Sequence, residues 1–329
     1  MNAVIFITVI LALTFDFING FHDTANSIAT AVSTKALSTR HAIIMAACMN
    51  FIGAVMFTGV AETIATKIVN LNTLDYGSYV LIAALISAIL WNLLTWFFGI
   101  PSSSSHTLIG SLAGAAICDA GLSSIKWHGF ISILESLIFS PVIAFAAGYL
   151  VFTIFKIVFK NFNLHKTNNV FRKIQIVTAA VQSFSHGTND AQKSMGIITM
   201  SLVSGGIIAE GHIPLWVQVS CAAAMAIGAS LGGWRIIKTV GTQIMKIRPV
   251  NGVAADMASA IVIFGASHIG LPVSTTHVIS SSIMGVGSSY RIRAVKWDTG
   301  RRMVTTWFIT IPISAVIAAV IFRVIMIFV

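Results

Sequence analysis

Charged side chains are scarce in this sequence. Only 9% of its 329 residues are Asp, Glu, Lys or Arg, whereas 56% are hydrophobic. A soluble domain carries about 25% charged residues. The chain therefore has too little polar surface to cover a water-soluble globule of its length, which excludes an ordinary soluble domain and indicates a membrane protein.

Cysteine is also rare. The three cysteines, Cys48, Cys118 and Cys221, each lie in an apolar stretch. Their number is odd, and their spacing matches neither a zinc site nor a disulfide framework. We interpret them as small packing residues, and we expect neither a cofactor nor a resident metal.

Long apolar runs dominate the rest of the chain. A transmembrane helix needs ~20 predominantly apolar residues. Because lipid offers the backbone no hydrogen-bond partner, we predict these runs to be helices and the fold to be an all-α integral membrane protein. The runs cover residues 41–59, 78–98, 129–155, 214–233, 252–269 and 303–328.

Acidic residues are outnumbered by basic ones, which gives a formal net charge of +10. In a soluble protein this excess would suggest a nucleic-acid partner. Here the basic residues gather between apolar runs, as in the cytoplasmic loops of membrane proteins, so we expect a lipid bilayer and no nucleic acid. The segments rich in Lys and Arg, which we place inside, are 35–40, 156–173, 234–248 and 291–302.

Two sequence motifs occur twice. Residues 17–27 (FINGFHDTANS) match 184–194 (FSHGTNDAQKS), and residues 99–106 (GIPSSSSH) match 270–277 (GLPVSTTH). The similar offsets indicate two halves built on one plan. We divide the chain into a first repeat, 1–155, a basic cytoplasmic linker, 156–173, and a second repeat, 174–329.

Counting membrane crossings gives the orientation of the two repeats. The loops 60–77, 119–128 and 205–213 carry few basic residues, so we place them outside the inner (plasma) membrane. Each half then crosses an odd number of times, which makes the repeats inverted and puts both termini outside.

The segments 78–118 and 252–287 each begin and end on one side of the membrane. Each could be two full spans or one re-entrant hairpin, but their short second limbs favour hairpins with polar tips inside the bilayer. Gly20 and Gly187 allow a local helix break. We therefore predict two inverted-topology repeats, each with a broken helix, full-length spans and a re-entrant hairpin.

The first pair of motifs places ionisable groups inside apolar segments. A charge at the bilayer centre costs at least ~2.5 kcal/mol on insertion scales. A polar contact between helices, such as an Asp–Lys pair, would explain one motif but not its duplication, so we favour a site for substrate and coupling cation. The candidates are Asp23, Asp190, His22 and His186 for the cation or proton, and Asn26, Asn189 and Lys193 for the substrate.

The second pair of motifs offers hydroxyl groups at helix starts. Pro101 and Pro272 interrupt the preceding helices, and Ser/Thr runs then open new ones. Helix N-termini bind anions through free N–H groups and the helix dipole, although ordinary N-caps would look similar. The predicted anion ligands are Ser103, Ser104, Ser105, Ser274, Thr275 and Thr276. His106 and His277 close the two clusters, either as part of the tip architecture or as proton carriers.

With its four motifs in order, the chain resembles the inorganic phosphate transporter family, in particular bacterial low-affinity phosphate permeases. The resemblance implies phosphate bound between the hairpin tips and the broken helices, import by cation symport, and a homodimer. It places Asp23, Asn26, Asn189, Asp190 and the hydroxyl clusters around phosphate and its cations.

The resemblance also bears on the coupling ion. The residues Phe21 and His22 before Asp23 are similar to those of bacterial proton-coupled members, which favours H⁺ over Na⁺. If sodium is the coupling ion, Asp23 and Asp190 are its expected ligands. Some bacterial relatives carry sulfate, and phosphate could also travel as a metal–phosphate complex.

Two other kinds of function fit the composition less well. A passive anion channel would need a continuous polar path, and the carboxylates of Asp23 and Asp190 oppose free anion flow. An intramembrane phosphatase or phosphotransferase would need one nucleophile beside one base, whereas the serines here form two symmetric clusters. We therefore predict a transporter and not an enzyme.

Overall fold

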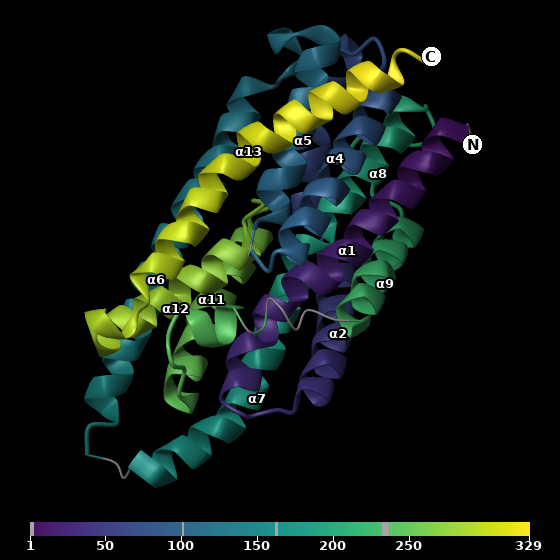
Figure 1. The fold of residues 1–329 in the computed structure, drawn as a ribbon. Coiled ribbons are helices and arrows are strands. Elements are labelled where there is room, and N and C mark those ends of the chain that lie inside the picture. Colours follow the sequence, from purple (N-terminus) through teal and green to yellow (C-terminus); the bar gives the residue numbers. More distant parts are fainter. Residues whose placement is uncertain (1–2, 101, 162–163, 232–236, 238) are drawn as a thin grey trace.

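The computed structural model describes residues 3–100, 102–161, 164–231, 237 and 239–329. Helices make up nearly all of this part of the chain (Figure 1). The first half contains α1 (Ala3–Ser33), α2 (Thr39–Met56), α3 (Gly59–Lys67), η1 (Leu71–Thr73), α4 (Gly77–Phe97), α5 (Ser104–Ala120), η2 (Leu122–Ser124) and α6 (Trp127–Val158). The second half contains α7 (Leu164–Asp190), α8 (Gln192–Ser204), α9 (Leu215–Leu231), η3 (Thr239–Gln243), α11 (Pro249–His268), α12 (Thr275–Tyr290), η4 (Ile292–Ala294) and α13 (Trp297–Ile325).

Six helices in the described residues are long and apolar enough to cross a membrane, namely α1, α2, α4, α6, α11 and α13. Large apolar side chains such as Val142 and Leu150 on α6 and Phe308 on α13 are more than half exposed. In water such surfaces would aggregate, whereas in lipid they are solvated. The prediction of a helical, multi-pass membrane protein is confirmed.

The helices that carry the first pair of motifs cross helices of the opposite half. At Gly20 of α1, an added Cβ would overlap the carbonyl oxygen of Met225 on α9. At Gly187 of α7, it would overlap the carbonyl oxygen of Asn50 on α2. Small residues let helix backbones touch in this way, and Figure 1 shows α9 beside α1. The two crossings are counterparts in the two halves.

The predicted helix break is absent at Gly20, and in the second half it lies at Ala191 and not at Gly187. The α-helix α1 is continuous from Ala3 to Ser33, and α7 runs through Gly187 to Asp190. The only interruption within the second motif is a single residue, Ala191, between α7 and α8. The glycines serve close helix contact instead of backbone freedom.

The hairpins α4–α5 and α11–α12 lie in opposite halves of the molecule, as Figure 1 shows. Their tips meet, since the Ser105 hydroxyl donates to the Val273 carbonyl at 2.8 Å. Each hairpin packs against the last helix of the other half. An added Cβ at Gly114 of α5 would overlap the carbonyl oxygen of Ala315 on α13, and one at Gly285 of α12 would overlap that of Phe145 on α6.

The two halves also share smaller details. The backbone N–H of Lys126 donates to the carbonyl of Ile68, and that of Lys296 donates to the carbonyl of Ile244. The indole N–H of Trp127 and that of Trp297 each donate to the carbonyl five residues earlier. Both chain ends lie at one end of the molecule (Figure 1), as inverted repeats with an odd number of crossings each require.

Some connecting segments differ from the loops that we expected. The segment 60–77 contains α3, whose residues Val60, Ala61 and Ile64 are buried. The segment 156–173 takes in the end of α6 and the beginning of α7. Of the predicted inside segment 234–248, residues 234–236 and 238 lie outside the described residues, and so does Pro101.

Candidate functional site

Asp23 of α1 is the centre of one half of the candidate site. Its side chain is 1% exposed and accepts hydrogen bonds from both hairpins. The hydroxyl of Ser104 at the start of α5 donates to Oδ2 at 2.6 Å, and that of Thr276 at the start of α12 donates to Oδ1 at 2.9 Å. His22 Nδ1 lies 2.7 Å from Oδ1. One carboxylate therefore joins α1 to the tips of both hairpins.

Asp190 at the end of α7 occupies the corresponding place in the second half. The Lys193 ammonium lies 2.8 Å from its Oδ1, and the Thr275 hydroxyl donates to its Oδ2 at 3.1 Å. His186 Nε2 lies 3.2 Å from the same Oδ2, one helical turn away on α7. Asn19 of α1 donates to it at 3.5 Å. Each motif aspartate thus lies within 3.2 Å of a histidine nitrogen and accepts a hydrogen bond from a hydroxyl at a hairpin tip.

Lys193 and Ser104 connect these two centres. The Lys193 ammonium donates to Ser104 Oγ at 3.0 Å, and Ser104 in turn donates to Asp23. Lys193 is 1% exposed, so its charge is compensated by buried partners and not by water. The result is a continuous polar chain through the middle of the molecule, from Asp190 to Asp23.

The hairpin tips start their second helices with serine N-caps. Ser103 accepts from the backbone N–H of His106 at 3.1 Å, and Ser274 accepts from that of His277 at 3.3 Å. A cap fixes where each helix begins, so the following residues Ser104, Thr275 and Thr276 point their hydroxyls at the aspartates. The positive ends of the α5 and α12 dipoles then lie at the site.

Two asparagines of the motifs hold the tip of the α11–α12 hairpin. The Asn189 Oδ1 accepts from the backbone N–H of Val273 at 3.1 Å, and its Nδ2 donates to the Leu271 carbonyl at 3.2 Å. Asn26 donates to the Thr276 hydroxyl at 2.8 Å. Asn189, whose Nδ2 also donates to Ser267 Oγ at 3.0 Å, therefore bonds α11 and the hairpin tip and not the aspartates.

The two tip histidines contact each other. The rings of His106 and His277 have centroids 4.5 Å apart, and His277 stacks on Trp307 of α13 at 3.9 Å. His106 Nδ1 lies 2.8 Å from Ser103 Oγ. Pro272 lies at the other end of this tip, where its carbonyl accepts from Ser136 at 2.6 Å. These contacts join the two tips to each other and hold them against α6 and α13.

The structure therefore brings most of the predicted residues together. Asp23, Asp190, Lys193, Ser104, Thr275, Thr276, Asn26, His22 and His186 form one buried network. Ser103, Ser105, Ser274, Asn189, His106, His277 and Pro272 shape and join the tips.

Several polar residues of the network were not singled out from the sequence. Asn50 Oδ1 lies 2.7 Å from His186 Nδ1, and Thr95 Oγ1 lies 3.3 Å from His22 Nε2. Gln192, which belongs to the second motif, lies beside this network and joins α8 to α3, since its Oε1 accepts from the backbone N–H groups of Val60 and Ala61 at 2.8 and 3.0 Å. Asn50 could have been found as a lone amide in an apolar run; Thr95 carries no such signal.

Cation binding would depend on few ligands in this network. Within the described residues, no group of three or more His, Cys, Asp and Glu side chains is placed to hold a metal ion. Oxygen ligands for a sodium ion would have to include hydroxyl and amide groups as well as Asp23 or Asp190. A proton needs only one such carboxylate or imidazole.

Comparisons with known proteins agree with this architecture. The family model described as the phosphate transporter family matches residues 19–166 and again 159–318. The chain is 62% identical over 313 residues to a probable low-affinity inorganic phosphate transporter of Bacillus subtilis, covering 95% of this chain and 94% of the relative. A relative of the same description from Rhizobium meliloti is 45% identical over 312 residues, with 94% and 92% covered.

A solved structure is similar over its whole length. It is titled "The sodium-dependent phosphate transporter", with a TM-score of 0.88, 25% sequence identity and complete coverage of both chains. The double match of the family model agrees with the two repeats of the fold. From its duplicated motifs, its interlocked hairpins and these matches, the chain belongs to the phosphate transporter family.

Proposed function

We propose that this protein imports inorganic phosphate by symport with a cation, and that the cation is a proton. The observation that supports the proposal most directly is the convergence of both hairpin tips on the two motif aspartates. Ser104 and Thr276 bond Asp23, and Thr275 bonds Asp190. Donors from two inverted elements thus meet at one buried point, where a single anion could contact all of them.

The donors suit a tetrahedral oxyanion. Ser104, Thr275 and Thr276 can turn their hydroxyls from carboxylate to phosphate oxygens, because a hydroxyl rotates freely about its C–O bond. Lys193 adds a charged donor beside Ser104. The N-terminal N–H groups of α5 and α12 add the partial positive charge of two helix dipoles. Asn26 supports Thr276 in this arrangement.

The two aspartates favour phosphate over sulfate. Near neutral pH phosphate keeps at least one proton, so it can donate a hydrogen bond to a carboxylate. Sulfate is fully ionised and can only accept. Beside Asp23 and Asp190, a sulfate oxygen would face carboxylate oxygens without a proton between them, and a buried polar contact left unmade is costly. Sulfate transport is therefore the less favoured alternative.

A cation is needed because the site already carries two carboxylates. Phosphate adds at least one negative charge, which Lys193 alone does not balance. The pairs His22–Asp23 and His186–Asp190, at 2.7 and 3.2 Å, offer a proton-accepting group in each half. Sodium remains the alternative, with Asp23 and Asp190 as ligands, and the solved neighbour is titled sodium-dependent. Phosphate as a metal–phosphate complex would bring its own cation.

Transport requires exposure of the site to each side in turn. In this structure the nine predicted residues of the network are at most 1% exposed, so the site is closed. We propose that the hairpin α4–α5 moves together with α13, and the hairpin α11–α12 together with α6, since these elements pack closely. The protein would lie in the inner membrane with both termini outside and the segment 156–173 inside, as a homodimer.

The test is uptake of labelled phosphate into proteoliposomes of the purified protein. An inward pH gradient and an inward sodium gradient are imposed separately, with excess unlabelled sulfate as competitor. We expect accumulation that follows the pH gradient and ignores sulfate. Accumulation driven only by the sodium gradient would identify sodium as the coupling ion. Uptake abolished by sulfate would identify sulfate as the substrate, and uptake indifferent to both gradients would indicate a channel.

The site itself is tested by Asp23→Asn and Asp190→Asn. Each change removes a carboxylate that bonds a tip hydroxyl and keeps the size of the side chain. We expect both variants to be expressed and to lose gradient-driven uptake. Glu210→Gln, at an exposed acidic residue between α8 and α9, is the matched control. Normal driven uptake in both site variants would contradict the assigned roles.

A further inference from the structure

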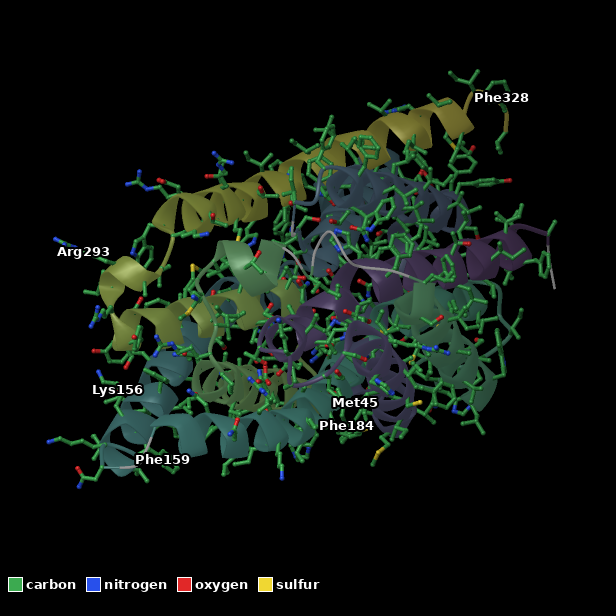
Figure 2. All side chains as sticks on the ribbon, turned by 60° about the horizontal axis from the view of Figure 1, so that its bottom comes forward. Met45, Lys156, Phe159, Phe184, Arg293 and Phe328 are labelled. Carbon is green, nitrogen blue, oxygen red and sulfur yellow. The ribbon has the colours of Figure 1, made fainter. Side chains whose placement is uncertain are left out.

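A polar cavity lies where the two halves join. It has a volume of about 440 Å³ and is bordered by the end of α6, the start of α11 and the end of α12. Figure 2 shows two of its lining residues, Lys156 and Phe159, at one end of the molecule, opposite Phe328. None of the residues assigned to phosphate transport above lines this cavity.

The cavity is strongly basic. Lys156, Lys160, Arg248 and Arg291 line it, and none of the described residues that line it is acidic. The guanidinium groups of Arg248 and Arg291 each lie 5.8 Å from the ring centre of Tyr290. The Lys156 ammonium donates to the Ser289 carbonyl at 2.9 Å. Contacts with neutral partners hold these cations in place without cancelling their charge.

The N-terminus of α11 contributes to the same cavity. The backbone N–H of Arg248 donates to Asn251 Oδ1 at 3.3 Å, which fixes the amide of Asn251. The other end of that amide, Nδ2, is buried and has no hydrogen-bond partner among the described residues, and the side chain is only 4% exposed. A buried donor without a partner costs free energy unless a ligand accepts from it. The dipole of the 20-residue helix α11 adds partial positive charge here.

The walls of the cavity are aromatic and apolar. Phe152 and Phe155 of α6, and Phe159 directly after α6, line it beside the cations. A group that is anionic at one end and apolar at the other would match this pairing of surfaces. Basic pockets between transmembrane helices at the cytoplasmic side bind lipid headgroups by the same chemistry.

We propose that this cavity binds a phosphate group, and that the group is the headgroup phosphate of an anionic phospholipid. The phosphate oxygens would accept from the four cations and from Asn251 Nδ2, and an acyl chain would lie along the phenylalanines of α6. The same chemistry could hold free phosphate that has left the transport site. The ligand would bridge α6 of the first half to α11 and α12 of the second.

The experiment measures ligand-dependent thermal stability of the purified, delipidated full-length protein. The probes are phosphatidylglycerol, phosphatidylcholine and inorganic phosphate. The cavity variant is Lys160→Gln with Arg291→Gln. The control is Arg293→Gln with Arg301→Gln, which removes two exposed cations that do not line the cavity. Lys160→Gln alone, at an exposed residue, serves if the double variant does not fold.

We expect phosphatidylglycerol to stabilise the wild type and the control more than phosphatidylcholine does. In the cavity variant its apparent affinity should fall about 25-fold, from about fivefold for each cation removed. If inorganic phosphate loses its effect instead, the bound phosphate is the free ion. Equal responses of the cavity variant and the control to both probes would overturn the proposal. Because the readout is stability, the result does not depend on the coupling ion or on transport.

Discussion

Lys193 shows how single residues shape the site. Its ammonium lies between Asp190 Oδ1 and Ser104 Oγ, and its side chain is almost completely buried. A buried ion pair gains little over apolar packing, but removal of one partner leaves an uncompensated charge. We therefore propose that Lys193 contributes to stability through Asp190 and to transport through Ser104, and the two roles can be separated by mutation.

We expect Lys193→Met to destabilise the protein by about 3–5 kcal/mol, because Asp190 then keeps a buried charge without its ammonium partner. The double variant with Asp190→Asn should recover much of this stability and remain inactive in uptake. Thermal unfolding in detergent measures the first effect, and phosphate uptake measures the second. A single variant as stable as the wild type would mean that the ion pair carries no structural role.

Asp16 is a second buried acid on α1, one turn before Asn19. Its side chain is fully buried, and neither carboxylate oxygen has a hydrogen-bond partner among the described residues. Ser194 of α8 and Cys221 of α9 are its polar neighbours. An ionised carboxyl without a partner is costly in such a place, and a bound proton removes the charge.

We therefore expect Asp16→Asn to retain phosphate exchange across the membrane but to lose accumulation driven by a pH gradient. Asparagine keeps the shape of the side chain and cannot bind a proton at this position. Counterflow of labelled phosphate measures exchange, and uptake under an imposed gradient measures coupling. Asp298→Asn, at an exposed residue of α13, is the control. Unchanged pH-driven accumulation would exclude Asp16 from coupling.

Among the helices, the crossings at glycine determine how the elements fit. Gly187 and Gly53 lie where α7 meets α2, and Gly20 and Gly228 lie where α1 meets α9. At each of the four, an added Cβ would overlap backbone of the partner helix. Backbone cannot move aside as the end of a flexible side chain can, so these positions tolerate no larger residue.

We expect Gly187→Ala to destabilise the protein by about 1–3 kcal/mol, since overpacking forces the helices apart. Gly265→Ala is the matched control, because this helical glycine of α11 has nothing within 4 Å of an added Cβ. The control should be neutral or stabilising by up to ~1 kcal/mol, from the better helix propensity of alanine. Equal thermal stability of the two variants would mean that the α7–α2 crossing accommodates the added methyl group.

The sequence predicted the elements better than it predicted their details. Apolar runs located the spans α2, α4, α6, α11 and α13, whereas the run 214–233 forms the shorter helix α9 and the span α1 was not among the runs. The duplicated hydroxyl clusters located both hairpin tips and the residues that meet Asp23 and Asp190. The glycines of the motifs were misjudged, because a glycine at a helix break and one at a close crossing look alike without the partner helix. Residues such as Thr95 join the network only through folding, so no pattern along the chain reveals them.

Over the whole molecule, the inverted plan predicts which surface each loop faces. Cysteines introduced at Lys35 and Arg293 should react with a membrane-impermeant thiol reagent only after the membrane is permeabilised, so that the reagent reaches the cytoplasmic side. Cysteines at Asp119 and Glu210 should react in intact cells, because basic loops remain inside. The native Cys48 is exposed in the structure, so it is replaced first. Labelling of all four positions from one side would contradict the inverted repeats.

The interlocking of the two halves has a consequence for biosynthesis. The helices α1 and α2 of the first half cross α9 and α7 of the second half, and each hairpin packs against the last span of the other half. When only residues 1–155 have been synthesised, the helices of the second half that pack against them do not yet exist. The helices of the first half must wait in the bilayer as loosely associated spans, and the polar residues of α1 must wait with them. Assembly is then a late event, and two separately synthesised halves should assemble into one transporter when they are made in the same cell.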